Sequence, residues 1–285
     1  MPWVPELFSA PVRQEFEDRW QHKPTAVPFF DGLLAGEIDP LLGSFAGEPE
    51  VHDPMRGRVR GADAFAAFVV EIGAWLRERN AVVEDVERVA RQRDGFEEVI
   101  LHLDGDTGRV ALPVAVTASK QPDTRLNELR MYFSGWALSG HHSLRPPVLQ
   151  PDPQLRESDV VGDYQQALAA GDLDAVLAAF EPDGYAREPA GGGHIHRGAD
   201  GLRAFYEQLF SNGGGIRLEH CAVIDDGRAC ALEYNVVRWG RDDLPPQAGV
   251  AVYVRGSSGR LAAARIYDDV DPPLAAAAAA RLSQP

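Results

Sequence analysis

The sequence predicts two tandem α+β domains, each with N-terminal helices packed on a curved, mainly antiparallel sheet. Three observations support this prediction. The chain of 285 residues is long enough for two domains of ordinary size. Its two halves share an ordered series of motifs. In each half the helical patterns precede the strand patterns, which is the order of an α+β layout.

The duplication is visible as matched motifs at a nearly constant separation. The segment Phe30–Asp39 is similar in sequence to Gln165–Asp174. Their glycines, Gly36 and Gly171, lie 135 positions apart. Further pairs follow in the same order: Asp53-Pro54 with Glu188-Pro189, Arg60-Gly61-Ala62-Asp63 with Arg197-Gly198-Ala199-Asp200, and Arg130-Met131-Tyr132 with Arg265-Ile266-Tyr267. An ordered series of this kind predicts two homologous domains.

A Pro-rich stretch separates the two copies. Arg145-Pro146-Pro147 and Gln150-Pro151-Asp152-Pro153 cannot form the interior of a helix or a central strand. The expected organisation is therefore an N-terminal extension at 1–24, a first domain at 25–140, a linker at 141–155, a second domain at 156–272 and an Ala-rich tail at 273–285. Within the extension, Phe8–Trp20 has the pattern of a short helix.

The helices of the second copy come first. Apolar residues recur at helical spacing over Val160–Ala170, which predicts an amphipathic helix. Gly171 is placed to end this helix as its C-cap, and Asp172 is placed to cap a short second helix. A third helix is predicted after Gly198, with an apolar face that includes Phe205.

The remaining segments have strand-type composition. One strand or loop is predicted around Tyr185–Pro189, between the second and third helices. Four more strands follow the third helix, at Ile216–Ile224, Ala229–Trp239, Gly249–Arg255 and Leu261–Val270. Turn sequences such as Asp226-Gly227 separate them, so consecutive strands are predicted to pair as antiparallel hairpins.

The charge and composition exclude several classes of protein. Lys and Arg number 28 against 43 Asp and Glu, a net charge of −15, which disfavours binding to nucleic acid or to an anionic membrane. No apolar run approaches the roughly 18 residues of a transmembrane helix, and the N-terminus lacks a signal-peptide pattern. Two cysteines, Cys221 and Cys230, are too few for a disulfide framework or a zinc site. We therefore expect a cytoplasmic protein.

The motifs of the second half carry a family resemblance. They are Tyr164, Gly171-Asp172-Leu173-Asp174, Phe180-Glu181-Pro182-Asp183, Glu188-Pro189 and Gly198–Tyr206. With these residues each half resembles the cone-shaped nuclear transport factor 2-like fold, and is most similar to SnoaL-like polyketide cyclases, ketosteroid isomerases and polyether-forming epoxide hydrolases. Because such cones commonly pack sheet to sheet as dimers, the resemblance implies an internal pseudo-dimer that could be monomeric in solution.

The resemblance to the isomerases implies a general base and an oxyanion donor. The acidic residue before the proline is the base of that pattern, and Asp53 and Glu188 stand there in the two copies. Tyr164 matches the tyrosine that donates to the oxyanion, whereas the first copy has Phe29. Ala251 stands at the position of the second donor, so true ketosteroid isomerase activity is not expected.

The other relatives imply further acids. Polyether epoxide hydrolases use two acids per cavity, whose pKa values separate because both cannot ionise cheaply. Glu84 could partner Asp53 in this way. Glu219, 135 positions after Glu84, could partner Glu188. The SnoaL-like cyclases place an acid on the last strand, where this sequence has Asp268.

A purely structural interpretation stays open for every candidate. His52 could orient Asp53 or act as a base itself, or it could have neither role. The structural alternatives are a turn residue for Asp53, a surface ion pair with Arg187 for Glu188, a buried helix tyrosine for Tyr164, and solvent-facing strand positions for Glu84, Glu219 and Asp268.

Metal and cofactor sites are not expected. His194 and His196 are spaced to face one side of a strand, but no further ligands with a fixed geometry are evident. Gly191-Gly192-Gly193 is too short and wrongly placed for a phosphate loop. His141-His142 lies at the linker and is expected to be solvated.

These observations predict a cofactor-independent enzyme that performs general acid–base chemistry on a small, largely apolar metabolite. Isomerisation, cyclisation and epoxide opening are the candidate reactions, and the second cavity is expected to be the better equipped. The alternative is a non-catalytic module that binds a hydrophobic ligand or a protein partner. A carboxyl group with a strongly raised pKa in a closed cavity would favour the enzyme.

Overall fold

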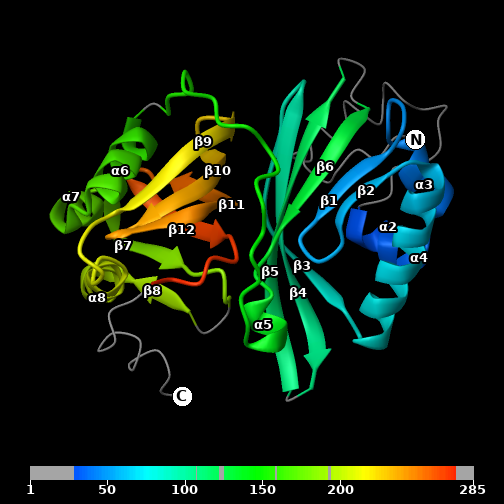
Figure 1. The fold of residues 1–285 in the computed structure, drawn as a ribbon, viewed down its shortest axis with the longest axis horizontal. Coiled ribbons are helices and arrows are strands. Elements are labelled where there is room, and N and C mark those ends of the chain that lie inside the picture. The colour runs from blue at the N-terminus through cyan, green and yellow to red at the C-terminus, as the bar shows by residue number, and fades with distance from the viewer. Residues whose placement is uncertain (1–28, 107, 122–124, 158, 192–193, 274–285) are drawn as a thin grey trace. The chain divides into compact units, whose positions relative to one another are not determined.

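The computed structural model describes residues 29–106, 108–121, 125–157, 159–191 and 194–273. The chain divides after Phe133 into two compact units, and each contains one six-stranded sheet with helices (Figure 1). The fold is therefore the expected pair of tandem α+β domains. The extension at 1–24 and all but the first residue of the Ala-rich tail lie outside the described residues. Within the described part of the chain, no helix is long and apolar enough to cross a membrane.

The first unit contains three helices and six strands among its described residues. They are α2 (Phe29–Ala35), α3 (Ile38–Gly43), β1 (Glu50–Asp53), β2 (Gly57–Arg60), α4 (Ala62–Glu78), β3 (Val82–Ala90), β4 (Asp94–Gly105), β5 (Gly108–Lys120) and β6 (Leu126–Tyr132). The strand order is β2-β1-β6-β5-β4-β3. Only the β1–β6 pair is parallel, because the chain crosses from β1 to the other edge before it returns.

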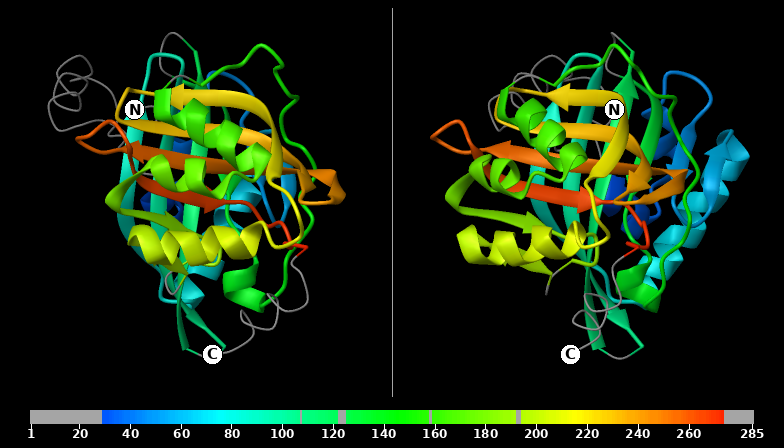
Figure 2. Two further views of the ribbon diagram at one scale, coloured as in Figure 1. Left: turned by 90° about the vertical axis from the view of Figure 1, so that its left-hand side faces the viewer. Right: turned by 60° about the vertical axis from the view of Figure 1, so that its left-hand side comes forward.

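The second unit repeats this layout. Its elements are α5 (Trp136–Ser139), α6 (Asp159–Ala170), α7 (Leu173–Ala178), β7 (Phe180–Arg187), β8 (Ile195–Arg197), α8 (Gly198–Leu209), β9 (Ile216–Asp225), β10 (Ala229–Trp239), β11 (Asp242–Arg255) and β12 (Leu261–Tyr267). The strand order is β8-β7-β12-β11-β10-β9. Helices α6, α7 and α8 lie on one face of this sheet (Figure 2).

The two sheets agree in register as well as in strand order. Val116 pairs with Met131 between β5 and β6, and Ala251 pairs with Ile266 between β11 and β12, each residue 135 positions later. A bulge also recurs at the matching place, because the pairing skips position 86 in β3 and position 221 in β9. The structure thus preserves the duplication down to an irregularity of the ladder.

The expected helix caps are present in the second unit. Gly171 has a φ of +69°, a left-handed conformation that glycine adopts without steric cost, and it follows the last residue of α6. Asp172 accepts a hydrogen bond of 3.0 Å from the backbone N–H of Ala175 and so caps α7. These caps fix where α6 ends, and α6 supplies Tyr164 to the core cluster between helices and sheet.

The Pro-rich stretch after α5 is hydrogen-bonded to the sheet of the second unit. The carbonyl of Arg145 accepts from the backbone of Ala248 in β11 at 3.0 Å. The carbonyl of Leu149 accepts from the Asn235 side chain in β10 at 3.2 Å. The Asp152 amide donates to the carbonyl of His220 in β9 at 2.8 Å. Proline has no backbone N–H group that must find a hydrogen-bond acceptor. This stretch can therefore follow the sheet without pairing with it as a strand.

Candidate active site in the second unit

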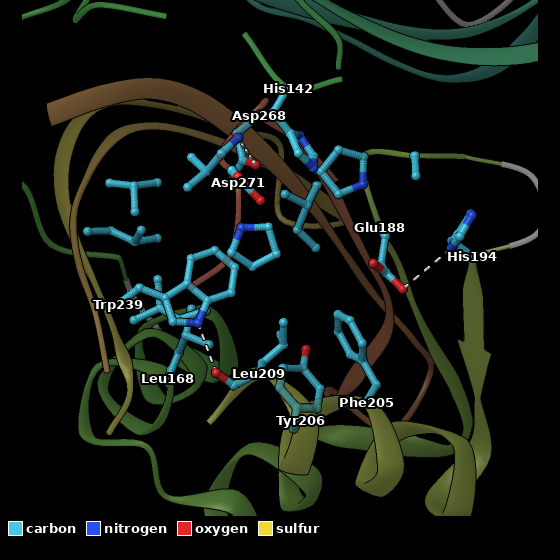
Figure 3. A pocket seen from close by; sticks show the side chains of 18 of the residues that line it. His142, Leu168, Glu188, His194, Phe205, Tyr206, Leu209, Trp239, Asp268 and Asp271 are labelled. Carbon is cyan, nitrogen blue, oxygen red and sulfur yellow. Dashed lines mark hydrogen bonds and ion pairs between the residues drawn. The ribbon is translucent and has the colours of Figure 1, made fainter. Parts of the chain in front are cut away.

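A cavity of about 610 Å³ opens between the helices and the sheet of the second unit (Figure 3). Residues from α6, α8, β9, β10, β11 and β12 line it, together with the segment around α5 and the residues that follow β7 and β12. Seven Phe, Tyr and Trp rings contribute to its walls: Trp136, Tyr164, Phe205, Tyr206, Tyr234, Trp239 and Tyr253. This size and lining are typical of sites for small, mainly apolar ligands.

The buried end of the cavity holds a pair of tyrosine hydroxyl groups. The hydroxyls of Tyr164 and Tyr206 lie 2.8 Å apart. Burial raises the pKa of Tyr164 to about 12 and holds the pKa of Tyr206 well above its ordinary value. Both groups therefore stay protonated at neutral pH. One of them can donate to the other while the second donates to a ligand.

Asp268 follows β12 and is the carboxyl group that faces the cavity from that strand. The hydroxyl of Tyr234 donates to its Oδ2 at 2.8 Å, and the amide of Val270 lies 3.5 Å from its Oδ1. Burial raises the pKa of Asp268 to about 6, because the surrounding protein solvates the carboxylate less well than water, and the hydrogen bond from Tyr234 only partly offsets this.

Glu188 faces the cavity from the end of β7. Its Oε1 lies 2.6 Å from Nε2 of His196 and 3.9 Å from Nδ1 of His194. The ring of His196 in turn stacks on Phe205, with 4.3 Å between centroids and 9° between planes. Glu188 is thus a second acid of the cavity, with its side chain held from one side by two histidines.

Asp269 points away from Asp268 into a separate, buried set of donors. Its Oδ1 accepts from Ser134 Oγ at 2.5 Å and lies 3.1 Å from His142 Nδ1. Its Oδ2 accepts from the backbone amides of Gly135 at 3.1 Å and Ser143 at 2.8 Å. Burial alone would raise the pKa of Asp269, but the four donors outweigh it and the pKa is lowered. Asp269 therefore ties the segment around α5 to the end of β12.

The family model of the SnoaL-like domain matches residues 161–264, which span α6 to β12. Residues 161–264 form a SnoaL-like domain. This confirms the resemblance predicted from the sequence for the second unit. Among curated proteins, none matches the sequence.

Three solved structures that are similar to this chain each correspond to less than half of it. SalBIII, an epoxide hydrolase/cyclase-like enzyme with a role in pyran-ring formation in the polyether salinomycin, is 17% identical, with a TM-score of 0.33, over 38% of this chain and 87% of its own. Bal32a, from a soil-derived mobile gene cassette, is 18% identical, with a TM-score of 0.33, over 38% and 86%. A SnoaL-like protein of Burkholderia thailandensis is 19% identical, with a TM-score of 0.32, over 37% and 88%.

Three of the candidates taken from the sequence lie at the cavity of the SnoaL-like domain. They are Tyr164, Glu188 and Asp268, which all line the cavity. Figure 3 shows Glu188 and Asp268 at its wall. Glu219 does not join them. It pairs with Asn235 on the face of the sheet away from the cavity, whereas its neighbour Leu218 lines the cavity. The structure therefore does not bring Glu219 to Glu188 as the two-acid arrangement requires.

The candidates of the first unit are more dispersed than those of the SnoaL-like domain. Asp53 is buried, and its Oδ1 accepts from the amides of Met55 and Arg56, both at 2.8 Å, which is the arrangement of an Asp-stabilised turn. Glu84 is exposed, pairs with His102 at 2.6 Å and lies on β3, at the opposite edge of the sheet from β1. The structure thus does not bring Glu84 to Asp53.

His52 lies on the face of β1 opposite Asp53. Its Nε2 is 2.9 Å from Glu50 and 3.4 Å from Glu128. These three residues are close enough together to share a metal ion. However, the guanidinium of Arg58 already makes two hydrogen bonds with Glu50, at 2.7 and 2.9 Å, and Arg130 pairs with Glu128. Arginines that neutralise both carboxylates favour an ion-pair network over a metal site.

The first unit retains only about 40 Å³ of the corresponding space. Phe29 and Phe133 stand where the SnoaL-like domain has Tyr164 and Asp268. Helix α4 has 17 residues against 12 in α8. Two residues near its end, Trp75 and Leu76, line the residual space. Phe133, which is larger and more apolar than Asp268, and the end of the longer helix thus occupy space that is open in the second unit.

Two kinds of residue at the cavity were not predicted from the sequence. Tyr234 and Tyr253 lie on predicted strands, and strand alternation with the apolar cavity face was a signal that could have placed them inside. His142 was expected to be solvated, but its side chain is only 22% exposed and lines the cavity of the SnoaL-like domain. No local sequence pattern indicates that His142 is partly buried, because its partner Asp269 lies 127 positions away in the sequence.

Proposed function

We propose that the second unit is a cofactor-independent general acid–base enzyme for a small, largely apolar molecule, with Asp268 as the group that transfers the proton. The observation that supports this is a single carboxyl group, Asp268, with a pKa raised to about 6 in an aromatic cavity of about 610 Å³. Strongly perturbed acids in closed cavities are typical of catalytic groups. Isomerisation, cyclisation and epoxide opening all remain reactions of this class.

The contacts of Asp268 suit it to proton abstraction. A carboxylate with a pKa near 6 is mostly ionised at pH 7, yet it is far more basic than an ordinary aspartate. Tyr234 fixes Oδ2, while Oδ1 has only the long contact of 3.5 Å from Val270. Oδ1 is therefore the oxygen proposed to take the proton.

The other polar groups of the cavity have supporting roles in this proposal. The hydroxyl pair of Tyr164 and Tyr206 can stabilise negative charge that develops on a substrate oxygen at the buried end. Glu188, held by His196, can accept a hydrogen bond from a substrate hydroxyl or relay a proton. Cys221 and Cys230 are both thiols, which agrees with the reducing cytoplasm as the proposed compartment.

The Kemp elimination of 5-nitrobenzisoxazole tests this proposal without knowledge of the natural substrate. A base removes the C–H proton, the C–H electron pair forms the nitrile and the N–O bond breaks to release a coloured phenolate. We expect the wild-type protein to accelerate this reaction, with a rate that falls as the pH drops through about 6, because Asp268 then becomes protonated. Asp268→Asn should lower the rate by roughly 100-fold or more.

Glu219→Gln is the matched control, because it removes one carboxylate of the same unit that faces away from the cavity. It should keep the wild-type rate. A wild-type protein no faster than Asp268→Asn would contradict the proposal. If such a protein still bound the probe saturably, the second unit would instead be a binding module.

A further inference from the structure

A second titratable group stands at the same end of the cavity as Asp268. Figure 3 shows His142 and Asp268 close together there, and both line the cavity. His142 comes from the segment after α5, outside the stretch that matches the SnoaL-like domain. The ring of Trp136 stacks on it, with 4.8 Å between centroids and 23° between planes. The imidazole therefore has a fixed plane at the wall of the cavity.

Asp269 fixes the orientation of this imidazole. The carboxylate is only 7% exposed, and three other donors, Ser134, Gly135 and Ser143, hold it in place. Its Oδ1 lies 3.1 Å from Nδ1 of His142, so Nδ1 carries a proton in this contact. Nε2 has no hydrogen-bond partner among the residues that the structure describes, and it is the ring nitrogen left for a ligand.

The charges around His142 favour its protonated form. Asp269 contacts it directly, and Asp268 and Asp271 are the other charged groups that act on it. The hydrogen bond to Asp269 is the main reason why the pKa of His142 is raised. The stacked indole of Trp136 also attracts a cation. These contacts therefore favour an imidazolium, with its Nε2–H, at the cavity.

We propose that His142 is a second catalytic group of this cavity, and that its Nε2–H donates a proton to the carbonyl oxygen of an enolisable ketone while Asp268 removes a proton from the neighbouring carbon. This inference rests on the proposed function of Asp268. Asp269 is the positioning residue of His142. The apolar body of the ketone would lie toward Leu168, Leu209 and Trp239, on the far side of the cavity in Figure 3.

All protons and electrons that move in this step come from the ketone, Asp268 and His142. The C–H bond breaks and its proton goes to Oδ1 of Asp268. The C–H electron pair becomes the C=C bond of the enol, and the C=O π pair moves to oxygen, which takes the proton from Nε2 of His142. The products are the enol, neutral Asp268 and neutral His142. Return of the proton from Asp268 to a different carbon, with His142 recovering its own, completes an isomerisation.

Hydrogen–deuterium exchange of 2-tetralone in D2O tests the proton donor. This bicyclic ketone exchanges its α-protons through the enol, so the reaction needs charge stabilisation at oxygen. The Kemp elimination does not, because the nitrophenolate leaves without a proton. We expect His142→Gln to slow the exchange of 2-tetralone by about 10- to 100-fold. The Kemp rate should fall by a smaller factor than the exchange rate, because the leaving phenolate needs no proton.

The pH profiles separate a catalytic from a structural role. In the wild type the exchange rate should fall at low pH as Asp268 gains a proton, and at high pH as His142 loses one. Asp269→Asn should move the high-pH limb to lower pH, because it removes the carboxylate that raises the pKa of His142. His142→Gln should abolish that limb. His141→Gln, a change at the exposed neighbouring histidine, is the matched control and should leave both limbs unchanged.

The outcomes distinguish the two proposals. Loss of both reactions in His142→Gln would overturn the inference, because His142 would then only shape the cavity. The inference would also be overturned if His142→Gln exchanged 2-tetralone at the wild-type rate, or if the wild type did not exchange it at all. Neither result would affect the proposed role of Asp268. Failure of the wild-type Kemp reaction would overturn the proposed function and this inference together.

Discussion

The Asp268→Asn variant should be more stable than the wild type by about 3 kcal/mol at pH 8. Burial raises the pKa of Asp268 from 3.8 to about 6, and each pH unit between these values corresponds to about 1.4 kcal/mol. The folded protein binds this proton more tightly than the unfolded chain does. Stability is therefore lost as the pH rises from about 4 to about 6, and it stays lower above that window. An asparagine cannot ionise, and its amide oxygen still accepts from Tyr234.

Urea unfolding of both proteins at pH 5 and pH 8 measures this effect. The gain should be about half as large at pH 5 as at pH 8, because the folded wild type is then mostly protonated at Asp268. Glu219→Gln controls for the loss of one negative charge from a chain of net charge −15. An equal gain at both pH values, or a loss of stability at pH 8, would contradict the assignment of Asp268 as a destabilised carboxylate.

Gly215→Ala should destabilise the second unit by about 3 kcal/mol or more. A Cβ atom at Gly215 would lie 2.1 Å from the carbonyl oxygen of Leu168, 2.4 Å from the amide nitrogen of Gly171 and 2.6 Å from the carbonyl oxygen of Ala169. All three are backbone atoms at the end of α6, which cannot turn aside as a flexible side chain can. The end of α6 and the start of β9 would have to separate.

Thermal unfolding measures this loss, with Gly201→Ala as the control in the same unit. A Cβ at Gly201 would meet only atoms at 3.5 Å or more, and Gly201 lies within α8, where alanine is favoured by about 0.5–1 kcal/mol. The control should therefore be as stable as the wild type or slightly more so. A Gly215→Ala protein that unfolds at the wild-type temperature would show that the two segments are not in close contact.

Much of the fold was predictable because its signals are local or repeated. The helix over Val160–Ala170 and the strand Ala229–Trp239 have strong periodic patterns, and the structure contains them as α6 and β10. The start of β11 was harder to predict from the sequence. It was predicted at Gly249, which follows Pro245 and Pro246. The structure begins β11 at Asp242. The prolines fall where pairing with β10 shifts, so the ladder needs no hydrogen bond from them.

The candidate site was predictable only where a residue lies on a regular element. Strand alternation puts residues 266 and 268 on one face, and both Ile266 and Asp268 line the cavity. The same reasoning left the orientation of Glu84 and Glu219 open, because a one-residue shift in a strand reverses every side chain. His142 lies in no periodic element. Its position follows from a hydrogen bond to a residue at the other end of the unit, which no local pattern encodes.

The segment that carries Trp136 and His142 has an evolutionary consequence. The segment lies between the last strand of the first copy and the first helix of the second. Joining two copies head to tail thus places a connecting peptide beside a cavity, where selection can act on its side chains without any change to the repeated elements.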